Sequence, residues 1–364
     1  MGSNSEGQES NKKNTKQIIL RVLNIIIATG FGAFLVYYLL KGGDVDINIS
    51  DIKQALLNMY KPTLIAGLAI MLLSNLFRAY RKNILVGSDR IGMGDMFLVA
   101  MIRNAFNMVL PARTGELSYV YVLTRRFMFP LEIGVSTLMV VMVFDLVIVF
   151  SLIVISIVIV GINTYAISSV LVVIIAAALL IGSLLILFFL SDIIGFFIMI
   201  YKKLLKRFKV SEKKMIHRIY NKILDINNNL KLIRGRKIYW KVYLSSIAAR
   251  LFKYTSYYLI IHAILSPLGY SFSDLNYWAI LLATMAAEIS AVLPTHAFAG
   301  LGTYEYSFIW VLVFLGFDEK ISKIVGFSYH FITLSFTVIL GIIAMIIISL
   351  PFYRIKKNGL EENK

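Results

Sequence analysis

Two segments of this sequence combine helix-breaking residues with charged ones in apolar surroundings. The first contains Leu110-Pro111-x3-Gly115-Glu116, and the second contains Leu293-Pro294-x5-Gly300-x-Gly302-x2-Glu305. An ionised side chain inside a membrane costs roughly 2.5–3.5 kcal/mol, and a broken helix at that depth leaves backbone groups that protein or water must satisfy. Such residues are therefore expected to face partners or a hydrated cavity, where they can bind a polar or anionic group.

In the first segment, Arg113 and Glu116 are three residues apart and can pair if a helix resumes after Pro111. One interpretation is a structural ion pair that closes the turn. In the other interpretation, Arg113 binds an anionic headgroup while Glu116 orients it or carries a proton. The spacing alone is compatible with both.

In the second segment, Gly300 and Gly302 permit a close backbone approach and expose N–H groups where a helix restarts, which suits an anion. Glu305 follows in the first helical turn, where its charge suits the helix dipole and where it can also be a simple cap. His296 is able to titrate near neutral pH, or only to hydrogen-bond. No second His or Cys lies close to it, so we predict no metal site.

Two further positions carry charge within apolar runs. Arg250 and Lys253 share a helical face with Tyr257, so they either extend towards the membrane surface or form a basic face for a lipid phosphate. Asp145 has no basic residue within four positions and needs a tertiary partner, for which Arg78 is a candidate.

The composition and the lengths of the apolar runs predict the elements that position these residues. The 364 residues are 59% hydrophobic and 16% charged, with a mean hydropathy of +0.78, which is too apolar for a soluble domain. The absence of cysteine excludes disulfides and thiol chemistry. About six runs are long enough to span a membrane as helices, namely 18–40, 63–82, 131–160, 166–190, 241–265 and 324–350. The stretches 96–124 and 277–317 are interrupted and do not read as simple spans.

The placement of charge predicts the topology. The net charge is +17, and fourteen Lys and Arg residues against two acidic ones lie between 201 and 241. Basic loops mark the cytoplasmic side, so this clustering argues against a nucleic-acid partner. The assignment that fits every loop puts both termini and the basic loop 201–241 in the cytoplasm, with 96–124 and 277–317 as re-entrant hairpins from opposite faces.

These elements form an inverted repeat, the plan by which many transporters place a site between two halves. We therefore predict an all-α polytopic membrane protein, with about six transmembrane helices and two re-entrant helical hairpins. Its predicted parts are a disordered polar tail (1–17), one transmembrane domain (18–350, with repeats at about 18–160 and 166–350) and a basic cytoplasmic tail (351–364).

At these residues the sequence resembles the membrane region of lysylphosphatidylglycerol synthases and the related stand-alone flippase-like proteins. The matching pieces are Arg78-Ala79-Tyr80-Arg81, Asn104-x2-Asn107-x2-Leu110-Pro111-x-Arg113-x-Gly115-Glu116, Asp145 and Leu293-Pro294…Gly300-x-Gly302-x2-Glu305. Together they extend over nearly the whole chain beyond residue 17. One departure is that Val143-Phe144 precede Asp145 where relatives often carry Glu-Arg, so a local partner of Asp145 is lost.

The resemblance implies a lipid-translocating module in the cell (cytoplasmic) membrane that needs no cofactor. We expect a flippase-like transporter of a polar lipid, either an anionic or aminoacylated phospholipid or a polyprenyl-linked lipid. Arg113, Glu116 and Glu305 would hold or gate the headgroup. The other candidate residues for binding or translocation are Arg78, Asn104, Asn107, Asp145, Arg250, Lys253, His296, Gly300 and Gly302.

Two alternatives stay open at this point. Too few polar residues follow the last apolar run to form the aminoacyl-transferase domain of the synthases, so an enzymatic role for this chain alone is not the favoured reading. The chain could act as a phosphatidylglycerol lysyltransferase-related protein with a separate catalytic partner. It could also be a non-transporting accessory subunit that presents lipid to a glycosyltransferase. A lipid-modifying enzyme partner and a homo-oligomer are both compatible with the sequence.

Overall fold

The computed structural model describes residues 29–42, 45–110, 114–161, 166–207, 214–291 and 298–350. Within these ranges the regular structure is helical and includes no strand. The predicted tails, 1–17 and 351–364, lie outside the described residues, as do Arg113 and His296.

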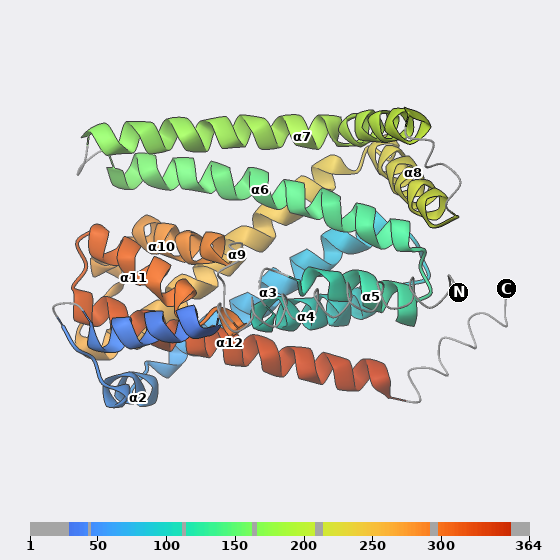
Figure 1. Cartoon of the computed structure of the whole chain (residues 1–364). Helices are drawn as coiled ribbons and strands as arrows, with labels where there is room; N and C mark the ends of the chain where they lie inside the picture. Colours follow the sequence, from blue (N-terminus) through green and yellow to red (C-terminus); the bar gives the residue numbers. More distant parts are fainter. Residues whose placement is uncertain are drawn as a thin grey trace, which may run out of the picture.

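Five long helices make up most of the fold, some lying roughly horizontally in Figure 1 and others crossing them obliquely. They are α3 (Lys61–Val86), α6 (Leu131–Gly161), α7 (Ala166–Arg207), α9 (Tyr239–Leu265) and α12 (Glu319–Ser349). Among the described residues, α3, α6 and α12 are both long and apolar enough to cross a membrane, and the two parts of α7 add a fourth only if they are counted together as one bent span. The predicted class, a helical membrane protein, is thereby confirmed, whereas the number of six spans stays a prediction.

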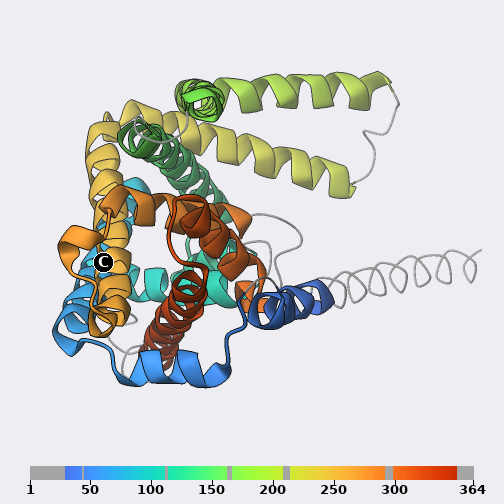
Figure 2. The same cartoon turned by 90° about the vertical axis from the view of Figure 1, so that its left-hand side faces the viewer.

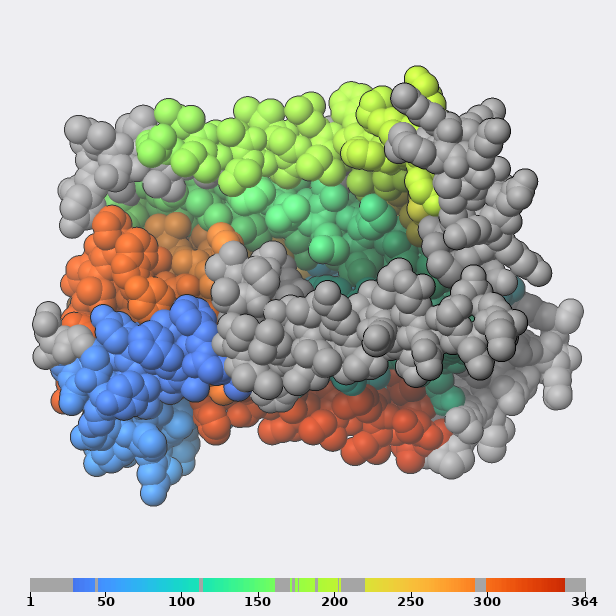
Figure 3. All heavy atoms as spheres, in the orientation of Figure 1, coloured from blue at the N-terminus to red at the C-terminus, as the bar shows by residue number. Residues whose placement is uncertain are grey.

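The two remaining predicted spans have helical counterparts. Residues 29–41, the described part of the run 18–40, are helical. Helix α9 has 27 residues, which corresponds to about 40 Å at 1.5 Å per residue, but it carries Arg250 and Lys253 within its length. Figure 3 shows how the helices are layered, with α7 covering one side of the molecule and α12 the opposite side.

Two helices lie where we expected loops. Helix α2 (Ile49–Leu57) follows residues 29–42, and α8 (Lys214–Gly235) occupies much of the basic stretch 201–241. The two parts of α7, Ala177–Ile186 and Phe189–Tyr201, are inclined at 70°. As a result, the second part of α7 runs beside α8 and away from the rest of the molecule, as Figure 2 shows. The sequence reading missed α8 because its many charges mask the apolar stripe that packs against α6.

Four shorter helices form two pairs that occupy opposite halves of the molecule in Figure 1. The pair α4 (Met93–Val109) and α5 (Glu116–Arg126) lies in the half towards α8, and the pair α10 (Tyr277–Ser290) and α11 (Thr303–Phe314) lies in the other half. The longest of the four has 17 residues, or about 26 Å, against roughly 30 Å of hydrocarbon. These pairs coincide with the two interrupted stretches of the sequence.

Small residues hold the helices close together, as is common in membrane proteins. A side chain at Gly67 of α3 would lie 3.1 Å from the Ser256 carbonyl oxygen of α9. In the same interface, the Ser74 hydroxyl donates a hydrogen bond of 2.7 Å to the Ala249 carbonyl. Any side chain at Gly341 of α12 would overlap Ala105 of α4. These contacts set the spacing of the helices that enclose the central cavity.

Candidate functional site

A cavity of about 130 Å³ lies between the two short helix pairs, each of which contributes to its lining. Its volume corresponds to about four water molecules. Helices α3, α4, α5, α6, α9, α10, α11 and α12 all contribute to its walls, so it is assembled from both halves of the chain. Its polar lining consists of Ser74, Asn75, Arg78, Arg103, Asn104, Asn107, Glu116, Asp145, Arg250, Lys253, Tyr257, Glu288, Tyr304 and Thr337.

One side of the cavity is closed by an ion pair within the α4–α5 pair. Arg103 Nη1 donates to both carboxylate oxygens of Glu116, at 2.6 and 2.5 Å. Asn107 donates to the same carboxylate at 3.2 Å. This geometry requires Gly115, because a side chain there would overlap the backbone of Asn107. The structure thus gives Glu116 a partner, Arg103, that lies thirteen residues earlier in the chain.

From Arg103 a hydrogen-bonded chain continues to α3. Arg103 Nη2 donates to Asn104 Oδ1 at 2.8 Å, and Asn104 Nδ2 donates to Asn75 Oδ1 at 2.8 Å. The sequence reading named Asn104 and Asn107 but missed Arg103 and Asn75. Arg103 carried a usable signal, since it is a charge in the same apolar segment as Glu116 and directly precedes Asn104.

Asp145 of α6 is held by two arginines from different helices. Arg81 binds it in a bidentate manner, at 2.6 and 3.0 Å, and Arg250 Nη2 lies 3.2 Å from it. The expectation that the partner of Asp145 is tertiary is met, but the choice of Arg78 was wrong. Arg81 lies nearly one helical turn further along α3, at the level of both Asp145 and Ser246, whose hydroxyl accepts a hydrogen bond of 2.9 Å from it.

Glu288 of α10 binds the two cations of α9. Arg250 Nη1 lies 3.0 Å from its carboxylate, and Lys253 Nζ forms a direct ion pair with it. Lys253 also lies over the ring of Tyr257, 5.3 Å from the ring centre. These cations therefore point into the fold and do not extend towards the membrane surface. Sequence reasoning missed Glu288, although it is the sole acidic residue of the apolar run 277–290.

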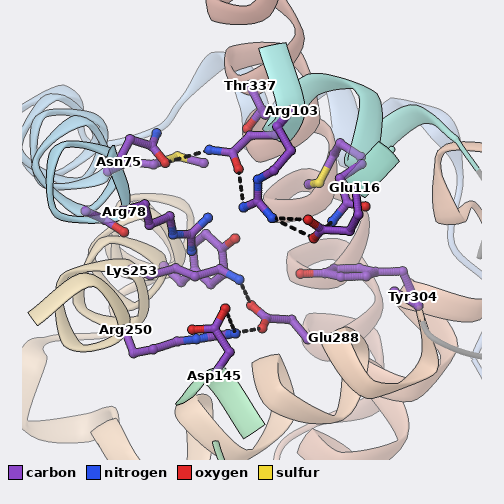
Figure 4. A pocket seen from close by; sticks show the side chains of 17 residues that line it. Asn75, Arg78, Arg103, Glu116, Asp145, Arg250, Lys253, Glu288, Tyr304 and Thr337 are labelled. Carbon is purple, nitrogen blue, oxygen red and sulfur yellow. Dashed lines mark hydrogen bonds and ion pairs between the residues drawn. The ribbon is translucent and has the colours of Figure 1, made fainter. Parts of the chain in front are cut away.

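Arg78 is the exception among the cavity's cations. Figure 4 shows its side chain reaching from α3 into the cavity, beside Lys253 and facing the carboxylates on the opposite wall. It makes no hydrogen bond or ion pair with any residue that the structure describes, whereas Arg103, Arg250 and Lys253 are all paired. Its charge is opposed by those of Arg250 and Arg103.

The balance of charge at the cavity is positive. Within the described part of the chain, its lining has three carboxylates, Glu116, Asp145 and Glu288, and four cations. Two more buried cations lie behind the wall. Arg81 binds Asp145, and the Lys82 ammonium lies 4.6 Å from the centre of the Tyr119 ring. Guanidinium groups bind phosphate and carboxylate with paired hydrogen bonds, so this cavity is suited to an anion.

The remaining predicted residues lie elsewhere. Glu305 is buried but does not line the cavity; one of its oxygens accepts a hydrogen bond of 2.7 Å from the Gly302 backbone, and the other lies 2.6 Å from His330 Nδ1. Gly300 and Gly302 both have positive φ, at 71° and 88°. The close approach at Gly302 is made by the carbonyl of Gly32, from the helix over residues 29–41.

This contact gives a stability prediction. Gly302→Ala should lower the free energy of unfolding by about 2 kcal/mol or more, because it adds backbone strain and an overlap with the Gly32 carbonyl. The measurement is the fraction of detergent-solubilised protein that stays monodisperse after heating. Gly94→Ala is the matched control, since nothing lies within 4 Å of that position. Equal melting temperatures for the two variants would contradict the described contact.

The geometry fits binding better than metal chemistry. Among the described residues, no group of three or more His, Asp or Glu side chains is placed to hold a metal ion. What the site offers is a set of guanidinium, ammonium and amide donors around a small volume.

Comparison with known proteins identifies a family. The family described as "Lysylphosphatidylglycerol synthase TM region" matches residues 22–341. No curated protein matches the chain.

Proposed function

The chain belongs to the family of the lysylphosphatidylglycerol synthase TM region, whose match includes every residue that lines the cavity, and we propose that it is a flippase-like lipid transporter. The family is related to lipid modification or transport in membranes. In this proposal the central cavity binds the negatively charged headgroup of a phospholipid while the acyl chains stay in the bilayer. The observation that carries the proposal is the excess of positive charge at the cavity, with Arg78 unpaired among the described residues.

The proposed architecture is the inverted repeat, with two re-entrant hairpins and both termini in the cytoplasm of a multi-pass cell-membrane protein. The packing supports it, because equivalent helices of the two halves have equivalent neighbours. Helix α12 packs on α4 just as α6 packs on α10, and α5 packs on α6 just as α11 packs on α12. The single domain 18–350 and its basic cytoplasmic segment 201–241 are part of the same proposal.

In the proposed mechanism, carboxylates of the protein form ion pairs with the cations of the cavity when no lipid is bound, and the lipid anion later replaces them. Glu288 forms ion pairs with Lys253 and Arg250, and Glu116 forms one with Arg103. Arg78 is then the first cation that an arriving phosphate meets. The cavity of about 130 Å³ is smaller than the 300–1,000 Å³ of ordinary ligand pockets. The short helix pairs must therefore move for the headgroup to pass. The Arg103–Glu116 ion pair ties α4 to α5, and the ion pairs of Glu288 tie α10 to α9.

Reconstituted vesicles test the proposal. The purified full chain is placed in liposomes that contain a fluorescent phosphatidylglycerol or phosphatidylcholine, and an impermeant quencher reports the fraction of label that has changed leaflet. We expect faster exchange of the anionic lipid than in protein-free vesicles. Monodisperse, correctly inserted protein that accelerates neither lipid, nor an aminoacylated or polyprenyl-linked one, would contradict transport.

The roles proposed for Arg113, Glu305 and His296 have their own outcome in this assay. Translocation that is unchanged by Arg113→Ala and Glu305→Gln would remove Arg113 and Glu305 from the headgroup path. In that case the path would be reduced to the residues of the cavity, of which Arg78, Asn104, Asn107, Glu116, Asp145, Arg250 and Lys253 were named from the sequence.

A further inference from the structure

A second hollow, separate from the cavity, runs along the side of the α4–α5 pair. It is a lateral groove of about 740 Å³ between α4, α5 and α12. Ile102, Phe106 and Leu110 form its wall on α4, and their spacing of four residues places them on one helical face. Met345 and Ile348 of α12 form the opposite wall. The side chains are apolar along most of its length.

The length of the groove matches one leaflet. Its wall on α5 is the row Leu117, Tyr121 and Arg125, which extends over eight residue steps, or about 12 Å. Half of a hydrocarbon core of roughly 30 Å is about 15 Å. The row begins beside Glu116 at the central cavity and ends with the last turn of α5, so it runs from the middle of the fold to one of its ends.

The outer end of the groove is basic. Arg126 Nη2 donates a hydrogen bond of 2.5 Å to the Ile348 carbonyl, which ties the end of α5 to the end of α12 and closes the groove there. Arg125, in contrast, is exposed, and it makes no hydrogen bond or ion pair with any described residue. An apolar groove that ends at an exposed guanidinium is complementary to a phospholipid, whose apolar acyl chain is joined through glycerol to a charged phosphate.

We propose that this groove binds one acyl chain of an anionic phospholipid from the leaflet that the α4–α5 pair enters, with the lipid phosphate at Arg125. The inference rests on the membrane placement in the proposed function, and it does not require transport. An anionic headgroup fits better than a zwitterionic one because it brings no cation of its own against Arg125 and Arg126. The groove would thus hold a lipid of the charge that the cavity accepts, directly beside the cavity.

Photo-crosslinking from within the groove tests this assignment. Tyr121→p-benzoylphenylalanine places the probe on an exposed groove residue, and the full chain is studied in nanodiscs with a fixed ratio of phosphatidylglycerol to phosphatidylcholine. Mass spectrometry of the adducts should show phosphatidylglycerol enriched about five-fold over its bulk ratio, the effect of one basic residue near the membrane surface. The same probe at Leu185, an exposed residue of α7, should report the bulk ratio.

Arginine variants make the test specific. Arg125→Gln should reduce the enrichment at Tyr121 to the value at Leu185. Arg90→Gln, an exposed arginine in the turn after α3, should leave it unchanged. Adducts at Tyr121 in the bulk ratio, or an enrichment that survives Arg125→Gln, would overturn the groove site.

A third variant separates this inference from the transport proposal. Arg78→Gln removes the unpaired cation of the cavity, so it should slow translocation and leave the enrichment at Tyr121 intact. If enrichment occurs but the protein moves no lipid, the groove site stands and the transport proposal fails. If translocation occurs without enrichment, the groove site alone fails.

Discussion

Arg78→Gln should slow translocation of the anionic lipid by roughly ten- to hundred-fold, because a buried hydrogen bond to a charged group contributes about 1.5–3 kcal/mol. The same variant should keep or raise the melting temperature. Arg78 makes no ion pair with a described residue, and its charge lies among the like charges of Arg103 and Arg250 and the opposite charge of Asp145. Its removal therefore leaves no carboxylate without a direct partner, since Asp145 keeps Arg81 and Arg250. A variant that loses function while its stability is unchanged indicates that the replaced residue binds the ligand and does not stabilise the fold.

The measurement pairs the liposome assay with a thermal melt of the same protein preparation. Arg90→Gln removes an exposed arginine outside the cavity and serves as the control for a general change in charge. Arg78→Lys should recover part of the rate, since it restores the charge but not the paired donors. Normal translocation by Arg78→Gln would refute the role of the unpaired guanidinium, and a large drop in melting temperature would show that its role is structural.

Arg81→Leu should have the largest effect on stability, a loss of about 3–5 kcal/mol, because it breaks a buried ion pair from one side. Arg81 is 1% exposed and binds Asp145 through both terminal nitrogens. Without it, Asp145 keeps one cation, Arg250, and the Ser246 hydroxyl loses a donor. The expected result is a much lower yield of monodisperse protein and a lower melting temperature.

A matched pair at the surface provides the comparison for this variant. Arg234 and Asp192 form the same kind of ion pair at 3.1 Å, but both side chains are about half exposed. Arg234→Leu should change stability by no more than about 0.5 kcal/mol. The double variant Arg81→Leu with Asp145→Leu should regain part of the lost stability, since it removes the stranded carboxylate as well. Equal effects of Arg81→Leu and Arg234→Leu would show that the buried network does not stabilise the fold.

The class of the protein and several residues of the candidate site could be predicted from sequence, for a physical reason. A charge or a helix break in an apolar run is costly, so Glu116, Asp145, Arg250 and Lys253 stood out against their surroundings. All four line the cavity. The same rule would have identified Arg103 and Glu288, if every charged residue within these apolar runs had been taken as a candidate for the site.

The pairing of those charges could not be predicted in the same way. Whether Asp145 meets Arg78 or Arg81 depends on how far α3 and α6 are shifted along each other, and such a shift is set by contacts between helices. Small residues such as Gly67 and Gly341 allow the close packing, but they do not show which partner helix fills the space. Helix α8 was missed for a different reason, since its charges conceal a packing stripe in what reads as a solvated loop.

The pairing between α9 and α10 has a consequence for the biogenesis of the protein. Arg250 is made 38 residues before Glu288, so α9 reaches the insertion machinery while one of its counter-charges is still inside the ribosome. Asp145, in contrast, precedes Arg250 in the chain, so we expect it to be the first carboxylate available to Arg250. Lys253 has no such early partner among the described residues. We therefore expect α9 to stay at the edge of the translocation channel until α10 arrives, so that the two helices enter the lipid together.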